Sequence, residues 1–240
     1  MKFNYGLKED VPIISSGRYF GTNHYLHNLH ILSNAIIYNK KESSKMFHKF
    51  DMIFSKIFAE AINDYTSSEK EKISFDGICA VPDKPGKNNK FVKITSEITK
   101  LINVENLSYN FKCTRAYDNQ KNKTSFTERQ NNIKNAFAYE RSLSGKNIAL
   151  IDDIMTTGAT LKECIKELYR AGAQRVICFV LAFNQFDCQF PSSDPILNTN
   201  SPLFFNSQTL KPFYIGKERE YNDYLTDFFS KLNKEILQNS

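Results

Sequence analysis

The chain has 240 residues with 41% hydrophobic side chains, enough to bury a core in one large domain or in one domain with added segments. No stretch reaches the ~18 apolar residues of a transmembrane helix, and the first residues lack the apolar core of a signal peptide, so we expect a cytoplasmic protein with no membrane partner. The net charge of +6 suits a polyphosphate ligand; nucleic acid is the weaker hypothesis, because no compact basic run stands out.

The N-terminal part gives a weak strand signal and then a strong helix signal. The apolar run 11–14 predicts a short strand. His24, His27 and His30 follow at steps of three, which drift around a helix, so a partly buried aromatic segment is favoured over a metal site. Apolar residues at spacings of three and four then predict an amphipathic helix over 44–66.

The next elements are typical of a β-loop-α-β unit. An apolar strand is predicted over 75–81, a Gly/Pro/Lys loop over 82–90, a helix over 91–102 and a second strand over 107–111. Residues 113–126 are polar without a period. A loop of ~14 residues inside a compact domain is often a lid over a ligand.

The most informative run is Asn-Ile-Ala-Leu-Ile-Asp-Asp-Ile-Met-Thr-Thr-Gly-Ala-Thr-Leu, residues 147–161. Its first apolar residues, 148–151, predict a buried strand that ends at Asp152 and Asp153. A hydroxyl-rich turn, Thr156 to Thr160, then opens into a helix. Such a turn offers unpaired N–H groups and the positive end of a helix dipole, which favour a phosphate.

Other parts of this run suit a sugar phosphate as well. Gly158 lets the backbone approach a ligand closely, and the two carboxylates can accept hydrogen bonds from ribose hydroxyls or hold Mg²⁺. The alternative is an ordinary strand–turn–helix with capping threonines. Because neighbouring strand residues point to opposite faces, both carboxylates reach one site only if the strand has ended and the turn redirects one of them.

The C-terminal part completes the sheet. A strand over 175–183 closes a second β-α-β unit, so the sheet should be parallel and covered on both faces. Residues 184–212 lose all periodicity and predict a long loop, and 213–215 predict a final strand. A helix over 218–237 carries an apolar stripe, which we expect to pack on its own domain; a homodimer interface is the alternative.

The run from Ile148 to Thr160 resembles the phosphoribosyl-pyrophosphate (PRPP) motif of the type I phosphoribosyltransferases. Arg129-x-x-Asn132 before an Ala-Phe pair resembles the ComF-like subgroup. This resemblance implies an α/β fold with a parallel twisted sheet flanked by helices, a small hood, and extra N- and C-terminal segments. We expect a hood with helical segment over 1–72, the core over 73–183, and a C-terminal loop and helix over 184–240.

The resemblance also implies roles for individual residues. Asp152 and Asp153 would serve catalysis by accepting from the ribose hydroxyls, directly or through Mg²⁺. A mobile loop would bring basic groups over the ligand, and the loop after the first core strand would bind pyrophosphate. The implied loop cations are Arg115, Lys121 and Lys123, and the implied PRPP-binding residues are Asp83, Lys84, Lys87, Arg129, Thr156, Thr157, Gly158, Ala159 and Thr160.

The expected function is binding of PRPP, or of a ribose 5-phosphate or nucleotide, with Mg²⁺, and transfer or hydrolysis of the phosphoribosyl group with release of pyrophosphate. Thr156 stands where hypoxanthine–guanine enzymes carry an acid, which argues against a standard 6-oxopurine salvage enzyme. The sequence does not distinguish between a base, an amine and water as the acceptor of the phosphoribosyl group. The alternative is a non-catalytic ligand sensor or effector that acts through a protein partner in competence, regulation or phage defence.

Overall fold

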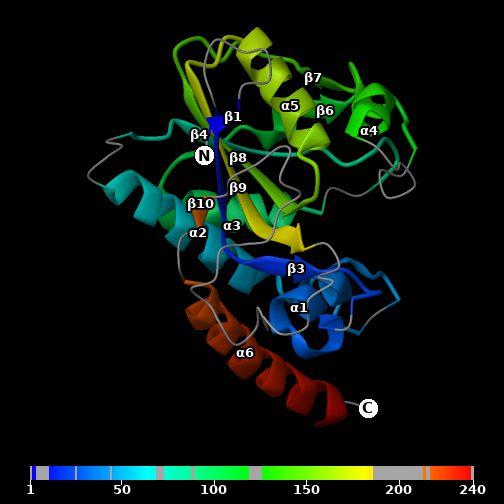
Figure 1. Cartoon of the computed structure of the whole chain (residues 1–240). Helices are drawn as coiled ribbons and strands as arrows, with labels where there is room; N and C mark the ends of the chain where they lie inside the picture. Colours follow the sequence, from blue (N-terminus) through cyan, green and yellow to red (C-terminus); the bar gives the residue numbers. More distant parts are fainter. Residues whose placement is uncertain are drawn as a thin grey trace.

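The computed structural model describes residues 2–3, 11–24, 26–43, 45–68, 73–87, 90–118, 126–185, 213–214 and 217–238. Within these ranges the chain forms an α/β fold, in which a mainly parallel sheet is flanked by helices (Figure 1). This confirms the fold class expected from the sequence. None of the described helices is both long and apolar enough to cross a membrane.

The central sheet has eight strands in the order β1-β2-β9-β8-β4-β5, with β10 paired to β2 and β3 paired to β9. Every pairing is parallel except β1 with β2. Parallel strands bring their carboxyl ends to one edge, which is where open α/β sheets bind ligands. The strands are β1 (Lys2–Phe3), β2 (Val11–Ser15), β3 (Arg18–Phe20), β4 (Gly77–Ala80), β5 (Glu105–Asn106), β8 (Asn147–Met155), β9 (Arg175–Gln185) and β10 (Phe213–Tyr214).

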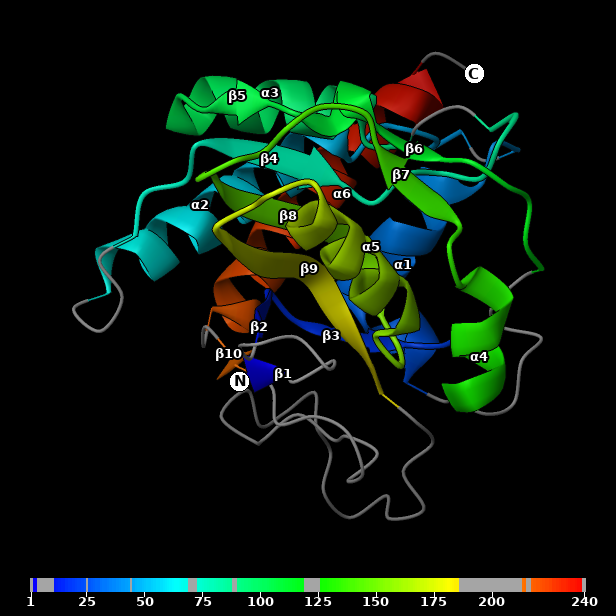
Figure 2. The ribbon, with the colours of Figure 1, turned by 90° about the horizontal axis from the view of Figure 1, so that it is seen from above.

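Helices cover both faces of the sheet, as its nearly continuous apolar strands require. In Figure 2, α5 lies in front of β8 and β9. On the other face α1, α2 and α3 pack against the sheet, and α6 lies over α1 and α2 at the lower end of Figure 1. The helices are α1 (Ile31–Lys40), α2 (Asp51–Ser67), α3 (Val92–Ile102), α4 (Phe126–Ile133), α5 (Ala159–Arg170) and α6 (Glu218–Gln238).

Strand β8 lies between the two hydrophobic cores. Ile148 and Leu150 pack on the α5 side, while Ala149 and Ile151 pack on the side of α1, α2 and α3. All four side chains are fully buried. This alternation holds β8 rigidly, because each successive residue is fixed by a different face. A smaller antiparallel pair, β6 (Phe111–Cys113) with β7 (Phe137–Tyr139), adds to the α5 side.

Helix α6 packs on its own chain, as predicted for the apolar stripe. Tyr221 and Leu225 are fully buried, and the ring of Phe229 lies 5.1 Å from that of Phe50. At the start of the helix Lys217 pairs with Asp64 on α2 at 2.8 Å. The proposed domain limits at 72/73 and 183/184 stay a prediction.

Some sequence predictions of secondary structure were wrong. The strand predicted over 107–111 is instead a 3-10 helix, Ser108–Asn110, between β5 and β6. The helix predicted over 44–66 begins at Asp51, because residues 45–50 form a turn whose Phe50 N–H donates to the Asn39 side chain at 2.8 Å. Helix α1 was not predicted at all. Strand β8 does not end at Asp152 but continues through both carboxylates to Met155, paired with β9.

Candidate functional site

Two adjoining pockets open at the carboxyl ends of β4, β8 and β9. The larger has a volume of about 770 Å³ and the smaller about 390 Å³. They share Asp152, Ile154 and Thr160 as a common wall. The site therefore centres on the end of β8, where the sequence had placed it.

Both carboxylates reach this centre although β8 does not end before them. Asp152 keeps its register with Val180 on β9, and its Oδ1 accepts the N–H of Asp153 at 2.9 Å. Asp153 Oδ1 in turn accepts the N–H of Ile154 at 2.6 Å. Each side chain thus folds toward the next peptide group along the strand, so the turn need not redirect either of them.

Two lysines from distant parts of the chain neutralise the carboxylates. Lys90 Nζ lies 2.7 Å from Asp153 Oδ2 and 3.5 Å from Asp152 Oδ1. Lys40, the last residue of α1, places its Nζ 2.5 Å from the same Oδ2 of Asp153. Two ammonium groups therefore face two carboxylates, and the centre of the site has no net charge.

These contacts give the two carboxyls opposite properties. Burial raises the pKa of Asp152, and although Lys90 opposes this, the adjacent Asp153 charge adds to it, so the pKa rises to about 6. Burial also acts to raise the pKa of Asp153, but Lys40 and Lys90 outweigh it and hold that pKa well below its usual range. Burial lowers the pKa of Lys90, yet Asp153, Asp152 and Asp83 leave it above its ordinary value.

The smaller pocket is lined by the turn predicted to bind phosphate. Thr156, Thr157, Ala159 and Thr160 all line it, together with Gly158. Gly158 has a φ of 72° and an αL conformation at the N-cap of α5, which favours glycine over residues with a side chain. Its carbonyl accepts from Lys162 N–H at 2.8 Å and so begins the helix.

Arg129 on α4 also lines the smaller pocket, as does Tyr19 on β3. The neighbouring Gln130 donates from Nε2 to the carbonyl of Ala159 at 3.1 Å and ties α4 to the start of α5. A guanidinium beside a helix N-terminus is a favourable arrangement for an anion.

The larger pocket is lined on one side by the loop after β4. Asp83, Lys84 and Lys87 contribute to its wall with Lys90. Asp83 Oδ2 accepts the backbone N–H of Lys90 at 2.7 Å, which closes the loop on itself. Lys84 Nζ lies 4.6 Å above the ring centre of Tyr117, a cation–π distance.

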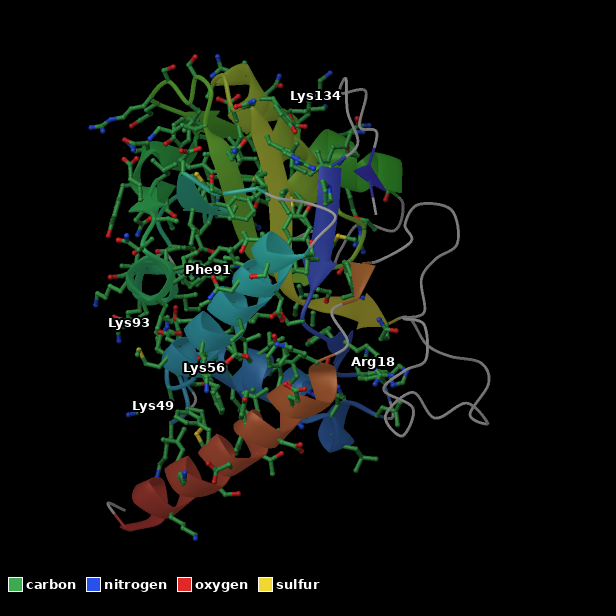
Figure 3. The ribbon with its side chains drawn as sticks, turned by 90° about the vertical axis from the view of Figure 1, so that its left-hand side faces the viewer. Arg18, Lys49, Lys56, Phe91, Lys93 and Lys134 are labelled. Atoms are coloured by element: carbon green, nitrogen blue, oxygen red, sulfur yellow. The ribbon has the colours of Figure 1, made fainter. Side chains whose placement is uncertain are left out.

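The opposite side of the larger pocket is apolar and aromatic, and the sequence did not reveal it. Two of its residues, Phe47 and His48, lie in the turn before α2. His48 Nδ1 is held 3.0 Å from Asp51 Oδ2. Apolar side chains from four elements complete this wall: Ile36, Phe54, Phe91, Ile94 and Leu181. Figure 3 labels Phe91 next to α2.

The structure brings most of the predicted site residues together, with three exceptions. Arg115 lines neither pocket; its guanidinium donates to the carbonyls of Asn132 and Lys134 at 3.0 and 2.6 Å. Lys121 and Lys123 lie outside the described residues, so their predicted role stays a prediction.

The three histidines of the N-terminal segment are buried, in agreement with the favoured interpretation of a partly buried aromatic segment. His27 Nδ1 lies 2.6 Å from the carbonyl of Phe20, and His30 Nδ1 accepts from Ser33 N–H at 3.3 Å as the N-cap of α1. Across the described ranges there is no group of three or more His, Cys, Asp or Glu side chains that could hold a metal ion.

The carboxylate pair does not fit a resident Mg²⁺ ion in this geometry. Carboxylate oxygens are the ligands that Mg²⁺ prefers, but Asp153 Oδ2 already contacts two ammonium groups. Asp153 Oδ1 and Asp152 Oδ1 accept backbone N–H groups as well. A metal ion on this pair would have to displace Lys40 and Lys90. The predicted requirement for Mg²⁺ stays a prediction.

Comparison with known proteins identifies the class of this domain. Residues 101–207 match the family model described as "Phosphoribosyl transferase domain". This range contains the carboxylate pair, the turn before α5 and Arg129, but not Lys40 or Lys90. The chain thus carries a phosphoribosyl transferase domain, as the motif had predicted.

Particular relatives agree with the predicted subgroup. The chain is 42% identical over 48 residues to "DNA utilization protein YhgH" of Escherichia coli (strain K12) and, at the same identity and length, of Salmonella typhimurium (strain LT2). The match covers 20% of this chain and only about a fifth (21%) of the length of these relatives. It is consistent with a ComF-like protein.

Solved structures with similar backbones include a glutamine PRPP amidotransferase from B. subtilis (TM-score 0.41, 16% identity, 61% of this chain and 30% of that chain). Another is a phosphoribosylpyrophosphate synthetase from Mycobacterium smegmatis (TM-score 0.43, 14% identity, 74% and 51%). A third is a purine phosphoribosyltransferase from Pyrococcus horikoshii (TM-score 0.35, 15% identity, 58% and 79%).

Proposed function

We propose that this protein binds PRPP, or a related ribose 5-phosphate or nucleotide, and transfers or hydrolyses the phosphoribosyl group with release of pyrophosphate. One observation carries the proposal. The turn suited to a phosphate and the lysine loop suited to a pyrophosphate lie in two pockets that meet at Asp152. A phosphorylated sugar with a second anionic group would span both.

The proposed binding mode follows the charges of the two pockets. The 5′-phosphate would lie in the smaller pocket, against the first N–H groups of α5 and the guanidinium of Arg129. The ribose would lie over Ile154, with its hydroxyls donating to the carboxylates. The pyrophosphate would lie in the larger pocket, within reach of Lys84 and Lys87.

The proposed chemistry needs no protein nucleophile. The bond between ribose C1 and the pyrophosphate oxygen breaks, the acceptor forms its bond to C1 and gives up a proton to water, and pyrophosphate leaves with both electrons of the broken bond. The lysine side chains would stabilise the charge that grows on the leaving pyrophosphate, and the pockets would hold C1 in line with the acceptor. Magnesium, where it is required, would be brought by the ligand and would offset the charge of the leaving pyrophosphate.

The acceptor would approach from the aromatic side of the larger pocket. Phe47, which is half-buried, provides a surface on which a flat ring could stack, and His48 is oriented by Asp51. Thr156 in place of an acid gives no support to a 6-oxopurine acceptor. A base, an amine and water therefore stay as alternatives for the acceptor.

The test measures pyrophosphate released from PRPP by the full chain, with Mg²⁺ and with each acceptor class in turn. Release that is lost in Asp152→Asn and Asp153→Asn, but kept in the surface variant Lys93→Met, supports the enzyme. Lys93 is exposed and lies at the outer edge of the molecule in Figure 3. PRPP binding without pyrophosphate release would replace the enzyme with the alternative, a ligand sensor that acts through a protein partner.

A further inference from the structure

The carboxylate pair carries its own counter-ions. Lys90 touches both carboxylates, and Lys40 touches Asp153. The side chains of Asp152 and Asp153 are only 10% and 12% exposed, while the two lysines are 32% and 36% exposed. The acids are thus enclosed, and each ammonium group faces both the acids and the pocket.

The backbone at or beside each lysine is held by hydrogen bonds. Lys40 is the C-terminal residue of α1, where a cation is favoured by the helix dipole. The residue before it, Asn39, donates to Asp51 at 2.8 Å and accepts from Phe50 N–H, which fixes the end of α1 on the start of α2.

Lys90 is fixed in an equally definite way, just before α3. Its backbone N–H donates to Asp83, and its Nζ lies 4.9 Å from the ring centre of Phe91, which is buried. The ammonium position is therefore set by the backbone at one end and by an aromatic ring along its side. Both lysines lie outside the residues that match the phosphoribosyl transferase domain. Similarity to that domain therefore does not explain why lysines stand at these two positions.

We propose that Lys40 and Lys90 serve as built-in counter-ions of Asp152 and Asp153, in the place where a divalent cation would bridge the acids and a ligand, so that the pocket holds a ribose phosphate without a resident metal ion. Each ammonium has three donors. Donors not used on the carboxylates are available to phosphate oxygens, which is the bridging role that a metal ion would otherwise fill.

The charges explain why a metal ion is excluded. A divalent cation at Asp153 Oδ2 would lie within a few ångströms of two ammonium groups, and like charges repel strongly in a partly dry site. Without the two lysines the site would attract a divalent cation, because two enclosed carboxylates without a counter-ion are hard oxygen ligands with a net charge of −2. The lysine variants should therefore gain the metal site that the natural protein lacks.

The metal part of this inference is independent of the proposed function, and it is tested with Mn²⁺ alone. Isothermal titration of Mn²⁺ into the full chain should show no saturable site in the natural protein at millimolar concentration. The double variant Lys40→Met/Lys90→Met should bind one Mn²⁺ ion at least about tenfold more tightly than the natural protein does. Adding Asp153→Asn to this double variant should abolish the Mn²⁺ binding. Lys93→Met is the matched control and should behave as the natural protein.

Folding of the variants needs a separate check, since removing one partner of a buried ion pair destabilises a protein. Circular dichroism and the midpoint of urea unfolding report it. Lys40→Met alone is the milder variant, because Lys40 is the more exposed lysine, and it should show a smaller gain in Mn²⁺ affinity. A natural protein that binds Mn²⁺ through Asp153 as tightly as the lysine variants would overturn the inference.

The ligand part rests on the proposed function. Ribose 5-phosphate, which has no pyrophosphate to bring a metal ion, should bind the natural protein with the same affinity, within about twofold, in Mg²⁺ and in EDTA. In Lys90→Met the affinity should become more than about tenfold weaker in EDTA than in Mg²⁺. If neither ribose 5-phosphate nor PRPP binds under any condition, the proposed function fails, while the Mn²⁺ titration still decides on the counter-ions.

Discussion

Neutralising one or the other of two neighbouring carboxylates should change stability in opposite directions. Asp152→Asn and Asp153→Asn replace adjacent residues of one strand with the same isosteric amide. Asp153 faces two ammonium groups, whereas Asp152 has only the longer contact to Lys90. We expect Asp152→Asn to stabilise the fold at pH 7.5 and Asp153→Asn to destabilise it.

The magnitudes follow from burial and charge. The pKa of Asp152 rises from 3.8 to about 6, so its ionised form costs about 3 kcal/mol in the folded state. An amide recovers only part of this, and we expect a gain of about 1–2 kcal/mol. Asp153→Asn leaves Lys90 with a weaker partner in an enclosed site, and removing one partner of a buried ion pair costs about 3–5 kcal/mol. We expect the cost of Asp153→Asn to lie at the lower end of this range, because the ammonium group of Lys40 can turn to solvent.

The pH dependence gives the two variants a second signature. Because the folded pKa of Asp152 is raised, the natural protein regains stability as the pH falls through about 6 toward 4. The advantage of Asp152→Asn should shrink over that window. The pKa of Asp153 is depressed, so its contribution is present above the unfolded pKa of about 4 and is lost below it.

Urea unfolding, followed by circular dichroism at pH 7.5 and pH 5, measures both effects. Circular dichroism is used because the chain contains no tryptophan whose fluorescence would report unfolding. Equal destabilisation by both substitutions at pH 7.5 would show that the two carboxylates share one environment, and the assignment of the lysines would be wrong.

Three further substitutions test other parts of the structure. Gly158→Ala places a side chain at a φ of 72°, and it should cost roughly 1–2 kcal/mol in urea unfolding and weaken ribose 5-phosphate binding in calorimetry; unchanged binding would remove the turn from the site. Arg129→Gln should weaken the same ligand at least about tenfold through loss of a charge-assisted hydrogen bond, whereas Lys134→Gln, exposed and labelled in Figure 3, should not. Phe50→Ala removes a fully buried ring that packs on Phe228 and Phe229, and it should cost about 3–5 kcal/mol; a loss near zero would mean that α6 does not dock there.

The sequence was sufficient for the parts of the site that lie in one contiguous run. The strand, the two carboxylates and the turn with Gly158 fall within 147–161, so their spacing alone places them together. The loop after β4 was also found, because the resemblance to the type I phosphoribosyltransferases implies a pyrophosphate-binding loop after the first core strand. What the run did not show was the length of β8, which continues because β9 remains paired beside it.

Helix α1 and Lys40 could not be predicted because their signals are long-range or unusual. His30 caps the helix, whereas serine, threonine, aspartate and asparagine are the common N-cap residues. Asn39 holds the turn before α2 through Phe50 N–H, a contact that helical periodicity does not encode. Lys40 meets Asp153 only after α1 has packed beside the sheet, so no local pattern links the two.

The central claim is that one ligand spans both pockets across Asp152. Calorimetric titration of PRPP into the natural protein, alone and after saturation with ribose 5-phosphate or with pyrophosphate, tests it most directly. The account predicts one binding site per chain, whose PRPP affinity is lowered by each competitor, because each occupies one of the two pockets. Absence of PRPP binding, or binding that neither competitor disturbs, would contradict it.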